Sequence, residues 1–580
     1  MLLTATQMKE VEQVAFARGV KAVDLMETAG QGIAEVVQQF FPQPGIAVLY
    51  CGKGNNAGDV LVTGRFLAAA GWKIFIRTAF LEEEMSELAR KELQQLKKEP
   101  LFFGEEKFSE RNHHSFVLLD GLLGIGAQGE PRGEIQNLIE ELNKRRSTQG
   151  AFVVAADLPS GLDAMTGIPS KFCVEADVTA VIAFAKTGLL ADTATNYVGR
   201  LALVPLTDLT RVFHCSRDKK AAKADGRRQM KDFDQGCMSP CCPDQNSSPT
   251  QHLDSLAPTR LAPLGLPLAF DLAPSGVRLS ALPGLAVERD EIFELRTAAA
   301  DSASLITTEK LRRLLPSRPF DVHKGIFGHV GIVAGSRGYL GAARLASTAA
   351  LHAGAGLVTL YAVPEIYDLL AVSVPPEVMV KSVTCYTDVL SERLDAIAIG
   401  PGLGLQHQPT ILEVIEKATV PSVVDADGLN ALAQEIPRLL KIQGSRLLTP
   451  HPREMERLFP CKDRIRVQWA TDFVTQYPVT LLLKGARTIV AEKEKSIAYN
   501  TTGNPGMASG GMGDVLTGVA AALLAAGHQP REAAMLGAWL CGYAAELAIF
   551  KEHASQESLG ATDVITNLGR AMKDLRAGVF

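Results

Sequence analysis

A chain of 580 residues is too long for one hydrophobic core, so its length predicts two to four domains. The formal net charge of −5 and the isoelectric point near 6.2 give no electrostatic basis for nucleic-acid binding. Nine scattered cysteines, no signal peptide and no apolar run near 18 residues favour a soluble protein in a reducing compartment, by default the cytoplasm.

The N-terminal part, residues 1–210, begins with two amphipathic helical patterns and continues as alternating strands and helices. The helical patterns cover 8–18 and 25–40, and the expected strands are 46–50, 73–79, 116–120, 152–156, 178–184 and 201–204. Short β-rich runs separated by helix-length segments indicate a parallel sheet with helices on both faces. This part is therefore expected to be an α/β domain, a Rossmann-like three-layer sandwich.

Three polar loops follow strands of this predicted sheet. A glycine-rich turn at 51–59 opens a helix after the first strand, Asp120 ends the third strand, and Asp157 ends the fourth. The ligand crevice of an open parallel sheet lies beyond the carboxyl ends of its strands, so these loops should converge on one site. The side-chain oxygens of Asn56, Asp120 and Ser160 would suit a monovalent or small divalent cation. Alternatively, the two aspartates only cap the turns that follow them.

The middle of the chain, residues 211–300, crowds Pro, Ser, Asp and Lys together without a sustained period. It is expected to be an irregular linker or insertion. Cys237, Cys241 and Cys242, with two histidines nearby in the sequence, raise the question of a zinc site. Because their spacing lacks the paired C-x2-C of structural zinc sites, a mobile cysteine-bearing linker is favoured.

The C-terminal part, residues 301–580, repeats the alternation of strands and helices. Its expected strands are 329–334, 357–362, 396–399, 422–424, 446–448 and 480–483, with a hairpin at 488–492 and 496–500. This pattern predicts a second parallel α/β domain with a hairpin added near its end.

The densest glycine run, residues 503–514, leads directly into an apolar helical segment. The unshielded N–H groups of such a helix start, with the helix dipole, can hold a phosphate or a developing oxyanion. Asp514 closes the run, and a single acid among such amides suits a base that takes a proton from a hydroxyl group while the amides stabilise a phosphoryl group. The alternative is an ordinary glycine-rich helix entry with Asp514 as its N-cap.

These motifs together resemble two known families. LMETAG at 25–30, GNNAGD at 54–59 and DLPSGLD at 157–163 resemble the NAD(P)H-hydrate epimerases over residues 1–210. HKGIFG at 323–328, GAGLV at 354–358, GPGLG at 400–404, TPHPRE at 449–454 and the glycine run are similar to the ADP-dependent NAD(P)H-hydrate dehydratases, which are ribokinase-like, over residues 301–580. The fusion resembles the bifunctional enzymes, both isomerase and lyase, that repair hydrated NADH and NADPH.

For the epimerase half, the resemblance implies that the hydrated dinucleotide is held by two loops and that Asp157 binds it as well. The loop residues are Asn55, Asn56, Ala57, Gly58 and Asp59, and Gly124, Ile125, Gly126, Ala127, Gln128, Gly129 and Glu130. It also implies potassium at Asn56, Asp120 and Ser160. Epimerisation needs ring opening, or loss and return of the hydroxyl group, and Asp157 could shuttle the proton.

The epimerase loop departs from the usual family sequence Asn-Asn-Gly-Gly-Asp-Gly at Ala57 and Val60, and Ile125 stands where threonine is common. A Cβ at position 57 could obstruct the approach of the backbone to a phosphate. A chain that is a dehydratase alone, with a non-catalytic N-terminal binding module, therefore stays open as an alternative.

For the dehydratase half, the resemblance implies that ADP phosphorylates the ring hydroxyl and that phosphate then leaves, giving AMP, phosphate and NAD(P)H. Asp514 would be the base, and the amides of 510–513 would form the anion hole. The adenine nucleotide would contact Lys484, Gly485, Ala486, Arg487, Thr488 and Gly513, whereas Ala342, Gly402, His451 and Asp514 would line the hydrated nicotinamide side.

Several alternatives remain for this half. His451 could equally be a helix-start residue with a satisfied ring. Asp425, Asp427 and Glu454 are candidates for binding magnesium through water, or for N-cap roles. The same loop chemistry would also suit a ribokinase-like kinase that uses ATP on a small hydroxymethyl substrate. We expect the substrates to be small molecules, a homo-oligomeric state, and neither nucleic acid nor a membrane as partner.

Overall fold

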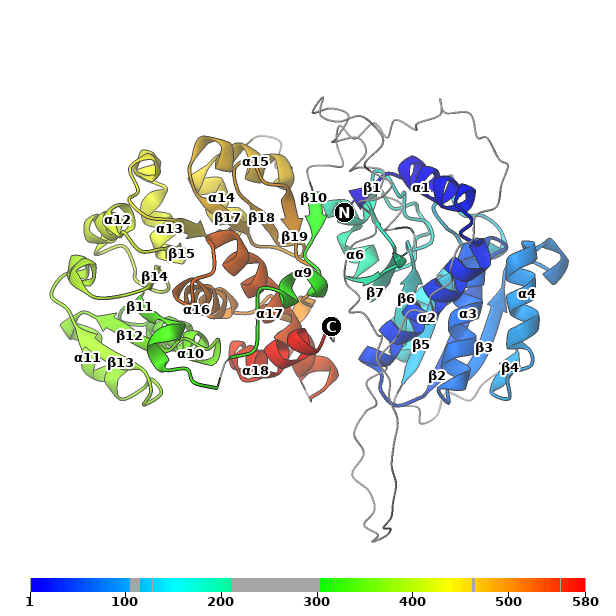
Figure 1. The fold of residues 1–580 in the computed structure, drawn as a ribbon, viewed down its shortest axis with the longest axis horizontal. Coiled ribbons are helices and arrows are strands. Elements are labelled where there is room, and N and C mark those ends of the chain that lie inside the picture. Colours follow the sequence, from blue (N-terminus) through cyan, green and yellow to red (C-terminus); the bar gives the residue numbers. More distant parts are fainter. Residues whose placement is uncertain are drawn as a thin grey trace, which may run out of the picture. The chain divides into compact units, whose positions relative to one another are not determined.

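The computed structural model describes residues 2–104, 115–127, 129–207, 209, 303–318, 320–461, 465–552 and 554–578. Within these residues the chain forms a seven-stranded sheet in its N-terminal half and a ten-stranded sheet in its C-terminal half (Figure 1). The predicted substrate residue Gln128 and the three cysteines at 237, 241 and 242 lie outside the described residues. The two halves are described separately.

The N-terminal half is built on a parallel sheet with the strand order β4-β3-β2-β5-β6-β7-β9. Its strands are β1 Leu2–Leu3, β2 Ile46–Cys51, β3 Lys73–Thr78, β4 Phe102–Gly104, β5 Phe116–Gly121, β6 Phe152–Ala156, β7 Val178–Ile182, β8 Ala185–Lys186 and β9 Arg200–Val204; its α-helices are α1 Ala5–Ala17, α2 Ala22–Phe40, α3 Asn55–Ala69, α4 Glu87–Leu96, α5 Glu134–Gln149 and α6 Thr195–Val198. All six predicted strands are present, within one or two residues. The strands β1, β4 and β8 are too short to give a sequence pattern.

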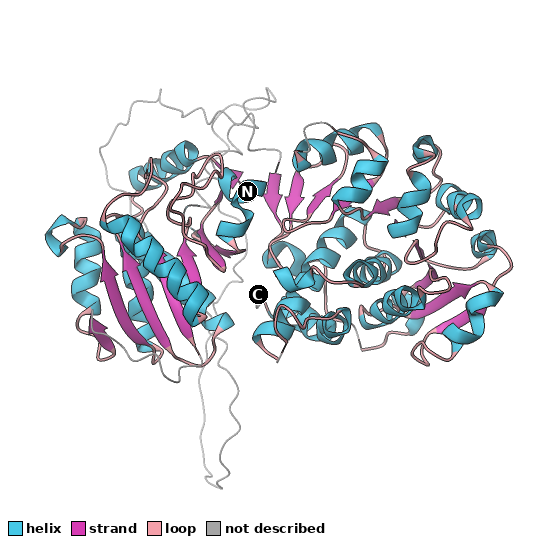
Figure 2. Cartoon of the chain, turned by 180° about the vertical axis from the view of Figure 1, so that it is seen from behind, coloured by secondary structure: helices cyan, strands magenta, loops and turns pink. Residues whose placement is uncertain are grey.

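Helices cover both faces of this sheet, and they lie in front of its strands in both views (Figures 1 and 2). The β2 residues Ile46, Val48 and Tyr50 join a buried cluster with the apolar side of α5. Leu49 points to the opposite face, where a Cβ on Gly64 of α3 would come within 2.5 Å of its Cδ1. This alternation along one buried strand confirms the predicted three-layer α/β sandwich.

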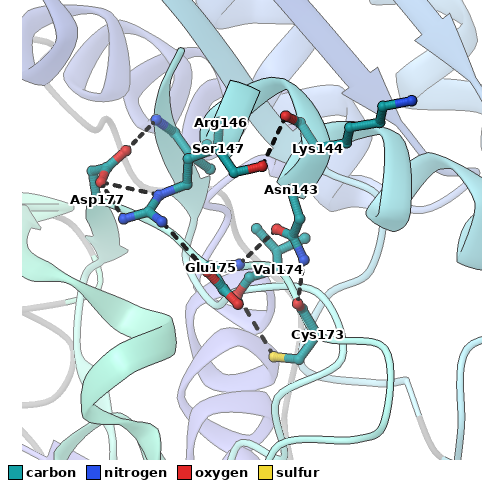
Figure 3. A network of polar contacts seen from close by, with 9 residues as sticks. Asn143, Lys144, Arg146, Ser147, Cys173, Val174, Glu175 and Asp177 are labelled. Atoms are coloured by element: carbon teal, nitrogen blue, oxygen red, sulfur yellow. Dashed lines mark hydrogen bonds and ion pairs between the residues drawn. The ribbon is translucent and has the colours of Figure 1, made fainter. Parts of the chain in front are cut away.

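A polar network fixes the segment between β6 and β7 to the end of α5 (Figure 3). The side chain of Asn143 donates to the Cys173 carbonyl at 2.8 Å and accepts from the Glu175 N–H at 3.0 Å. Arg146 pairs with Asp177 at 2.8 Å. Because the neighbouring Val174 N–H donates to the carbonyl oxygen of Ser160 at 2.9 Å, this network also supports the loop that carries the predicted cation ligand.

The C-terminal half contains a mixed sheet with the order β10-β19-β18-β17-β16-β15-β14-β11-β12-β13, in which only β18 runs antiparallel to its neighbours. Its strands are β10 Ala303–Leu305, β11 His329–Val333, β12 Leu357–Ala362, β13 Met379–Ser382, β14 Ala396–Ile399, β15 Ser422–Val424, β16 Arg446–Leu448, β17 Thr480–Leu483, β18 Ile489–Ala491 and β19 Ile497–Tyr499; its α-helices are α9 Thr308–Arg312, α10 Leu340–His352, α11 Pro364–Ala371, α12 Gln408–Lys417, α13 Ala426–Leu432, α14 Pro452–Leu458, α15 Arg466–Gln476, α16 Met512–Ala525, α17 Pro530–Phe550 and α18 Ala561–Ala577. The predicted strands and the hairpin β18–β19 are confirmed, whereas β10 and β13 were not predicted.

The strand β11 lies between β12 and β14. The strands β12 and β13 follow on one side of β11, and the chain then crosses to the other side to form β14 and β15, so β11 marks the topological switch point of the sheet. Ligands of open α/β sheets bind beyond the carboxyl ends of the strands at such a switch point. The helices α10 and α16 lie against β11 and β14 there, and a Cβ on Gly518 of α16 would come within 2.1 Å of the Ala346 carbonyl of α10. The absence of a side chain at Gly518 thus allows α16, which carries Asp514, to lie directly on α10.

The helix α17 corrects the expectation that the chain has no apolar run near 18 residues. By length and composition alone it could cross a membrane, with a mean hydropathy of 1.5 over its most apolar window. In the structure 83 % of that window is buried, and the helix contacts α16, α18 and the strands β16, β17 and β18. Burial within the protein accounts for its apolar composition.

Candidate active sites

The loop after β6 carries Asp157, which the sequence predicts as the proton shuttle of the epimerase half. Its φ of +63° is a left-handed conformation that a non-glycine residue keeps only where its surroundings hold it there. Its Oδ1 accepts a hydrogen bond from the Ile182 N–H at 3.0 Å and pairs with Nζ of Lys186. Because the Lys186 side chain is only 1 % exposed, Asp157 is fixed beside a buried cation.

Two further carboxyl groups interact with this ion pair. Burial raises the pKa of Asp59 well above its usual range, and the charges of Asp157 and Glu12 raise it further, against the effect of Lys186. Burial also raises the pKa of Glu12 on α1, where Lys186 and Lys9 oppose the shift and Asp157 adds to it. The structure thus joins the predicted residues Asp59 and Asp157 to Glu12 and Lys186, which the sequence did not reveal.

The predicted cation ligands Asn56, Asp120 and Ser160 are connected by hydrogen bonds. Ser160 donates to the fully buried carboxylate of Asp120 through its N–H at 2.7 Å and its hydroxyl at 2.6 Å, and the Leu122 N–H donates at 3.2 Å. The Asn56 amide donates to the Leu123 carbonyl at 2.8 Å, and the Leu123 N–H donates to Oγ of Ser160 at 2.9 Å. In the described part of the chain these donors to Asp120 are all neutral, so a cation would suit the buried charge.

The glycine-rich turn after β2 forms the start of α3, with Gly54 as N-cap. Asn55 is exposed and Asn56 is partly buried, whereas Ala57 and Val60 have no exposed surface. The methyl group of Ala57 therefore points away from the surface that a ligand could reach, and the obstruction expected from the sequence has no support in the structure.

The loop after β5 faces this turn, because a Cβ on Gly124 would lie 3.4 Å from Cβ of Asn56. Together with the Asp120–Ser160 hydrogen bonds, this contact confirms that the three polar loops converge. The remaining predicted residues of the loop are partly buried or exposed: Ile125, Gly126, Ala127, Gly129 and Glu130. Glu130 accepts a hydrogen bond from the Lys171 N–H at 2.9 Å.

In the C-terminal half, Asp514 lies in the first turn of α16. The N-cap of this helix is Gly511, whose φ of +88° favours glycine, so Asp514 does not cap the helix. Gly510 is exposed and the neighbouring Gly513 is partly exposed. Burial raises the pKa of Asp514 to about 6, with a further increase from Asp425 that Lys484 opposes. The structure thus combines a carboxyl group of raised basicity with an accessible helix start.

Asp514 lies beside an ion pair formed by the buried Asp425 and the partly exposed Lys484. Nζ of Lys484 is 2.7 Å from Oδ1 of Asp425, and the hydroxyl of Thr517, one turn after Asp514, donates to Oδ2 at 2.9 Å. Although burial alone would lower the pKa of Lys484, the carboxylates of Asp425 and Glu454 keep it above the usual value. A Cβ on Gly513 would lie 3.3 Å from both members of the pair, so the helix start and the lysine are adjacent.

His451 is the N-cap of α14, as one alternative from the sequence predicted. Its Nδ1 accepts hydrogen bonds from the N–H groups of Arg453 and Glu454 at 3.1 and 3.3 Å, and Oε2 of Glu454 accepts from the His451 N–H at 2.8 Å. Burial lowers the pKa of His451 against the opposing charge of Glu454, which agrees with a neutral ring. Its side chain remains 44 % exposed, so capping does not prevent contact with a ligand.

The magnesium candidates are already occupied by protein donors. Both oxygens of Asp425 have donors, Asp427 accepts from the Gly404 N–H at 2.8 Å and from Asn430 at 3.1 Å, and Glu454 belongs to the cap of α14. Among the described residues no group of three His, Cys, Asp or Glu side chains is arranged to hold a metal. These carboxylates do not fit direct coordination of magnesium.

The predicted nucleotide loop follows β17. Gly485 and Ala486 are exposed and Thr488 is partly exposed, but the side chain of Arg487 is buried and therefore does not line the open surface. The guanidinium of Arg466 donates to the carbonyls of residues 483, 484 and 487 at 3.0–3.3 Å and so fixes this loop.

On the predicted nicotinamide side, Gly402 has a φ of +61°. A Cβ there would come within 3.0 Å of Cβ of Ala342 and within 2.9 Å of Cβ of Tyr339, so the two predicted residues Ala342 and Gly402 touch. Tyr339 is 64 % exposed at this place, and sequence reasoning did not select it.

The residues that the sequence missed follow a common pattern. Lys186 and Glu12 lie outside the glycine motifs, and only the three-dimensional fold brings them to Asp157. Thr517 carried a readable signal, because it is a polar residue inside an apolar helix and lies three positions after Asp514, on the same helix face.

Comparison with known proteins gives two family matches. Residues 330–568 match the family model described as NAD(P)H-hydrate dehydratase, and residues 22–188 match the YjeF-related protein N-terminus. The chain is 31 % identical over 611 residues to the bifunctional NAD(P)H-hydrate repair enzyme of Moorella thermoacetica, covering 100 % of this chain and 98 % of that one. Its identity to the Escherichia coli enzyme of the same name is 30 %, over 96 % and 91 % of the two chains.

Two solved structures resemble separate halves. The ADP/ATP-dependent NAD(P)H-hydrate dehydratase of Bacillus subtilis, co-crystallised with ATP and Mg²⁺, is 29 % identical over 47 % of this chain and 98 % of its own, with a TM-score of 0.41. The yeast protein YNL200c is 20 % identical over 32 % of this chain and 82 % of its own, with a TM-score of 0.29. From its full-length match to these curated relatives, the chain belongs to the family of bifunctional NAD(P)H-hydrate repair enzymes.

Proposed function

We propose that the two halves carry out successive steps in the repair of hydrated nicotinamide nucleotides. The N-terminal half interconverts the R and S epimers of hydrated NADH or NADPH, written NAD(P)HX. The C-terminal half dehydrates the S epimer to NAD(P)H while ADP is converted to AMP and phosphate. The observation that carries the proposal is the placement of Asp514, a base of raised pKa, at an accessible glycine-rich helix start beside Lys484.

In the dehydratase half, Asp514 takes the proton from the ring hydroxyl as the terminal phosphoryl group of the nucleotide is transferred to it. The N–H groups of residues 510–513 and the ammonium group of Lys484 stabilise the charge on the transferred group. The phosphate then leaves with the C–O bond electrons, and loss of a ring proton forms the C=C bond. The nucleotide occupies the loop of residues 484–488 on the side of the exposed Gly485 and Ala486, whereas the side chain of Arg487 stays buried.

The substrate side of the dehydratase site is formed by Ala342, Gly402 and His451. The close contact between Ala342 and Gly402 leaves no room for a side chain at position 402, so the partly exposed backbone there can approach the substrate closely. The side chain of His451 is 44 % exposed, so its ring can contact the substrate.

In the epimerase half, the turn of residues 55–59 and the loop of residues 124–130 hold the dinucleotide, and Asp157 moves the proton. Potassium fits the hydrogen-bonded group of Asn56, Asp120 and Ser160, because it would supply the positive charge that the buried Asp120 carboxylate otherwise lacks. Its contribution when bound is to hold the three loops together.

Magnesium enters the proposal only with the nucleotide, because the protein carboxylates around Lys484 already have partners. Phosphate oxygens and water would supply its ligands. We also propose that ATP can replace ADP as the phosphoryl donor, that the protein is cytoplasmic, and that it forms a homo-oligomer. A small-molecule kinase and a chain with only dehydratase activity are the competing functions.

The test uses the full-length chain and a mixture of both hydrated NADH epimers, with ADP, with ATP and without nucleotide. The absorbance of reduced nicotinamide should rise only with nucleotide and should account for both epimers. Conversion of only the S epimer at the enzymatic rate would leave a dehydratase with a silent N-terminal half. No rise with either nucleotide would contradict the repair function and favour a kinase.

A further inference from the structure

Asp425 follows β15 directly, yet its carboxylate does not serve the helix that starts there. The residue occupies the N-cap position of α13, where an aspartate usually accepts a backbone N–H, but its side chain makes no capping hydrogen bond. This side chain is only 2 % exposed. Because a buried carboxylate is costly unless it has partners, the two oxygens must be used elsewhere.

Both oxygens of Asp425 contact elements that carry the predicted dehydratase site. Oδ1 accepts a hydrogen bond from Nζ of Lys484, after β17, at 2.7 Å, and Oδ2 accepts from the Thr517 hydroxyl, on α16, at 2.9 Å. Thr517 is fully buried and lies three positions after Asp514 on the same helix. One carboxylate therefore connects the helix of the proposed base to the lysine of the predicted nucleotide loop.

The backbone around Asp425 is held as firmly as its side chain. Its N–H donates to the Ile399 carbonyl at 3.0 Å, and its own carbonyl accepts from the Gly428 N–H at 2.9 Å. The next residue, Ala426, has a φ of +46°, which a residue with a side chain keeps only where its surroundings impose it. A Cβ on Gly400 would come within 1.8 Å of the Asp425 carbonyl oxygen, so the end of the neighbouring strand packs directly on this peptide. The fold thus fixes the position of the carboxylate.

Lys484 is held by one contact and keeps donors for a ligand. An ammonium group has three N–H donors, and within the described ranges only Asp425 accepts a hydrogen bond from it. Oε2 of Glu454 lies 3.8 Å from Nζ, beyond hydrogen-bond distance. The Lys484 side chain is 20 % exposed, and a Cβ on Gly513 would lie 3.3 Å from Nζ. Its remaining donors are therefore next to the helix start that would receive the phosphate.

We infer that Asp425 is a positioning residue of the dehydratase half, which holds the ammonium group of Lys484 at the start of α16 and is itself held by Thr517. The inference rests on the proposed dehydratase function and deepens it, because it names the groups that place the cation beside the transferred phosphate. A lysine that is already held loses less rotamer freedom when the phosphate arrives, so more of its attraction is available to the reaction.

The charge of Asp425 also acts on the proposed base. Burial raises the pKa of Asp514 to about 6, the charge of Asp425 adds to this increase, and the charge of Lys484 opposes it. The other titratable groups beside Lys484 are Glu454 and His451, both at the start of α14. Removal of the Asp425 charge lowers the pKa of Asp514, and a released Lys484 that approaches Asp514 acts in the same direction.

The test is Asp425→Asn in the full-length chain, which keeps the size of the side chain and removes its charge. With S-NADHX and ADP, kcat should fall by about 100-fold, the effect of misplacing a group by about 1 Å, while the KM for S-NADHX stays close to wild type. The acid limb of kcat/KM should move from near pH ~6 to lower pH. Thr517→Val should lower kcat by a smaller factor, and Thr517→Ser should restore it, because serine keeps the hydroxyl group.

The matched control is Ser347→Ala on α10, which removes a buried hydroxyl group that donates to carbonyls of its own helix and should leave kcat and the acid limb unchanged. A folded Asp425→Asn chain with the wild-type kcat would overturn the inference. A lower kcat with the acid limb unchanged would also overturn it, because it indicates a structural role. Complete loss in Asp425→Asn beside an active Asp514→Asn chain would make Asp425 the base and equally overturn it.

If Asp425→Asn does not fold, Thr517→Val decides. A kcat equal to that of Ser347→Ala would overturn the inference, and a loss that Thr517→Ser restores would support it. A wild-type chain that forms no NADH from S-NADHX with ADP or with ATP would instead refute the proposed dehydratase function.

Discussion

Replacing Asp514 with asparagine is expected to abolish NAD(P)H recovery from the S hydrate, because the change keeps the size of the side chain and removes the base. The magnitude follows from its environment. With a pKa of about 6, set first by burial, the carboxyl group is ~90 % ionised near pH ~7 and ~10 % ionised near pH ~5. Since only the ionised form accepts the hydroxyl proton, the wild-type kcat/KM should fall roughly tenfold over that interval.

The assay follows the absorbance of reduced nicotinamide with S-NADHX and saturating ADP across this pH range. Proton transfer of this kind contributes about 10²–10⁴ in rate, which is the loss expected for Asp514→Asn at neutral pH. Substrate binding by Asp514→Asn should remain close to wild type. The matched control is Asp472→Asn on α15, which removes an exposed carboxylate that accepts a hydrogen bond from Gln468 on its own helix and should leave the pH profile unchanged.

Two results would refute this reasoning. An acid limb near the ordinary value of an aspartate, about 4, would mean that the buried Asp514 does not control the reaction. Residual activity in Asp514→Asn that keeps the wild-type acid limb would assign the limb to another group. A neighbouring carboxyl such as Asp425 would then be the base.

Three further changes test single contacts. Thr517→Val removes the donor to the buried Asp425 carboxylate, so the free energy of unfolding should fall by about 1–3 kcal/mol in a denaturant titration, whereas Thr471→Val on the exposed side of α15 should change it little. Potassium in place of tetramethylammonium, at constant ionic strength, should raise the melting temperature. At a hundredfold excess of potassium over its Kd the stabilisation is equivalent to about 2.7 kcal/mol, and Asp120→Asn should remove it. Equal melting temperatures in both salts would contradict a potassium site. Ala57→Gly should leave the epimerisation rate unchanged and lower the melting temperature, because the buried methyl group does not face the ligand and glycine costs about 1 kcal/mol in a helix.

The sequence predicted the elements whose pattern is local. The runs at 152–156 and 396–399 are apolar on both sides and long enough to be recognised as buried strands, and the structure has them at the same residues. The two-residue strands β1 and β8 have no period to detect. Their pairing places Leu3 opposite Lys186, which forms the ion pair with Asp157 of the predicted epimerase site. Because neither strand has a sequence pattern, this contact of Lys186 could not be predicted.

The glycine motifs could be recognised in the sequence because a backbone that closely approaches another backbone or a ligand has no room for a side chain. What they did not predict is the electrostatic environment of the site. The ion pair of Asp425 with Lys484 joins residues 59 positions apart, and it forms because the carboxyl ends of β15 and β17 lie at the same edge of the sheet. The sequence around Asp425 and around Lys484 gives no indication that the two residues pair.

The two halves use the same arrangement with different accessibility. Each half has an aspartate directly after a strand and in contact with a lysine, and each has a non-glycine residue with positive φ at that place: Asp157 itself at +63°, and Ala426, directly after Asp425, at +46°. Lys186 is 1 % exposed, so it remains with Asp157 and can only tune the proton chemistry of its neighbours. Lys484 is 20 % exposed and borders an open helix start, so it can exchange part of its contact with Asp425 for the phosphate of an incoming nucleotide. Such an exchange would place positive charge on the transferred group only when the nucleotide is bound, and we propose it as the difference between the epimerase site and the dehydratase site.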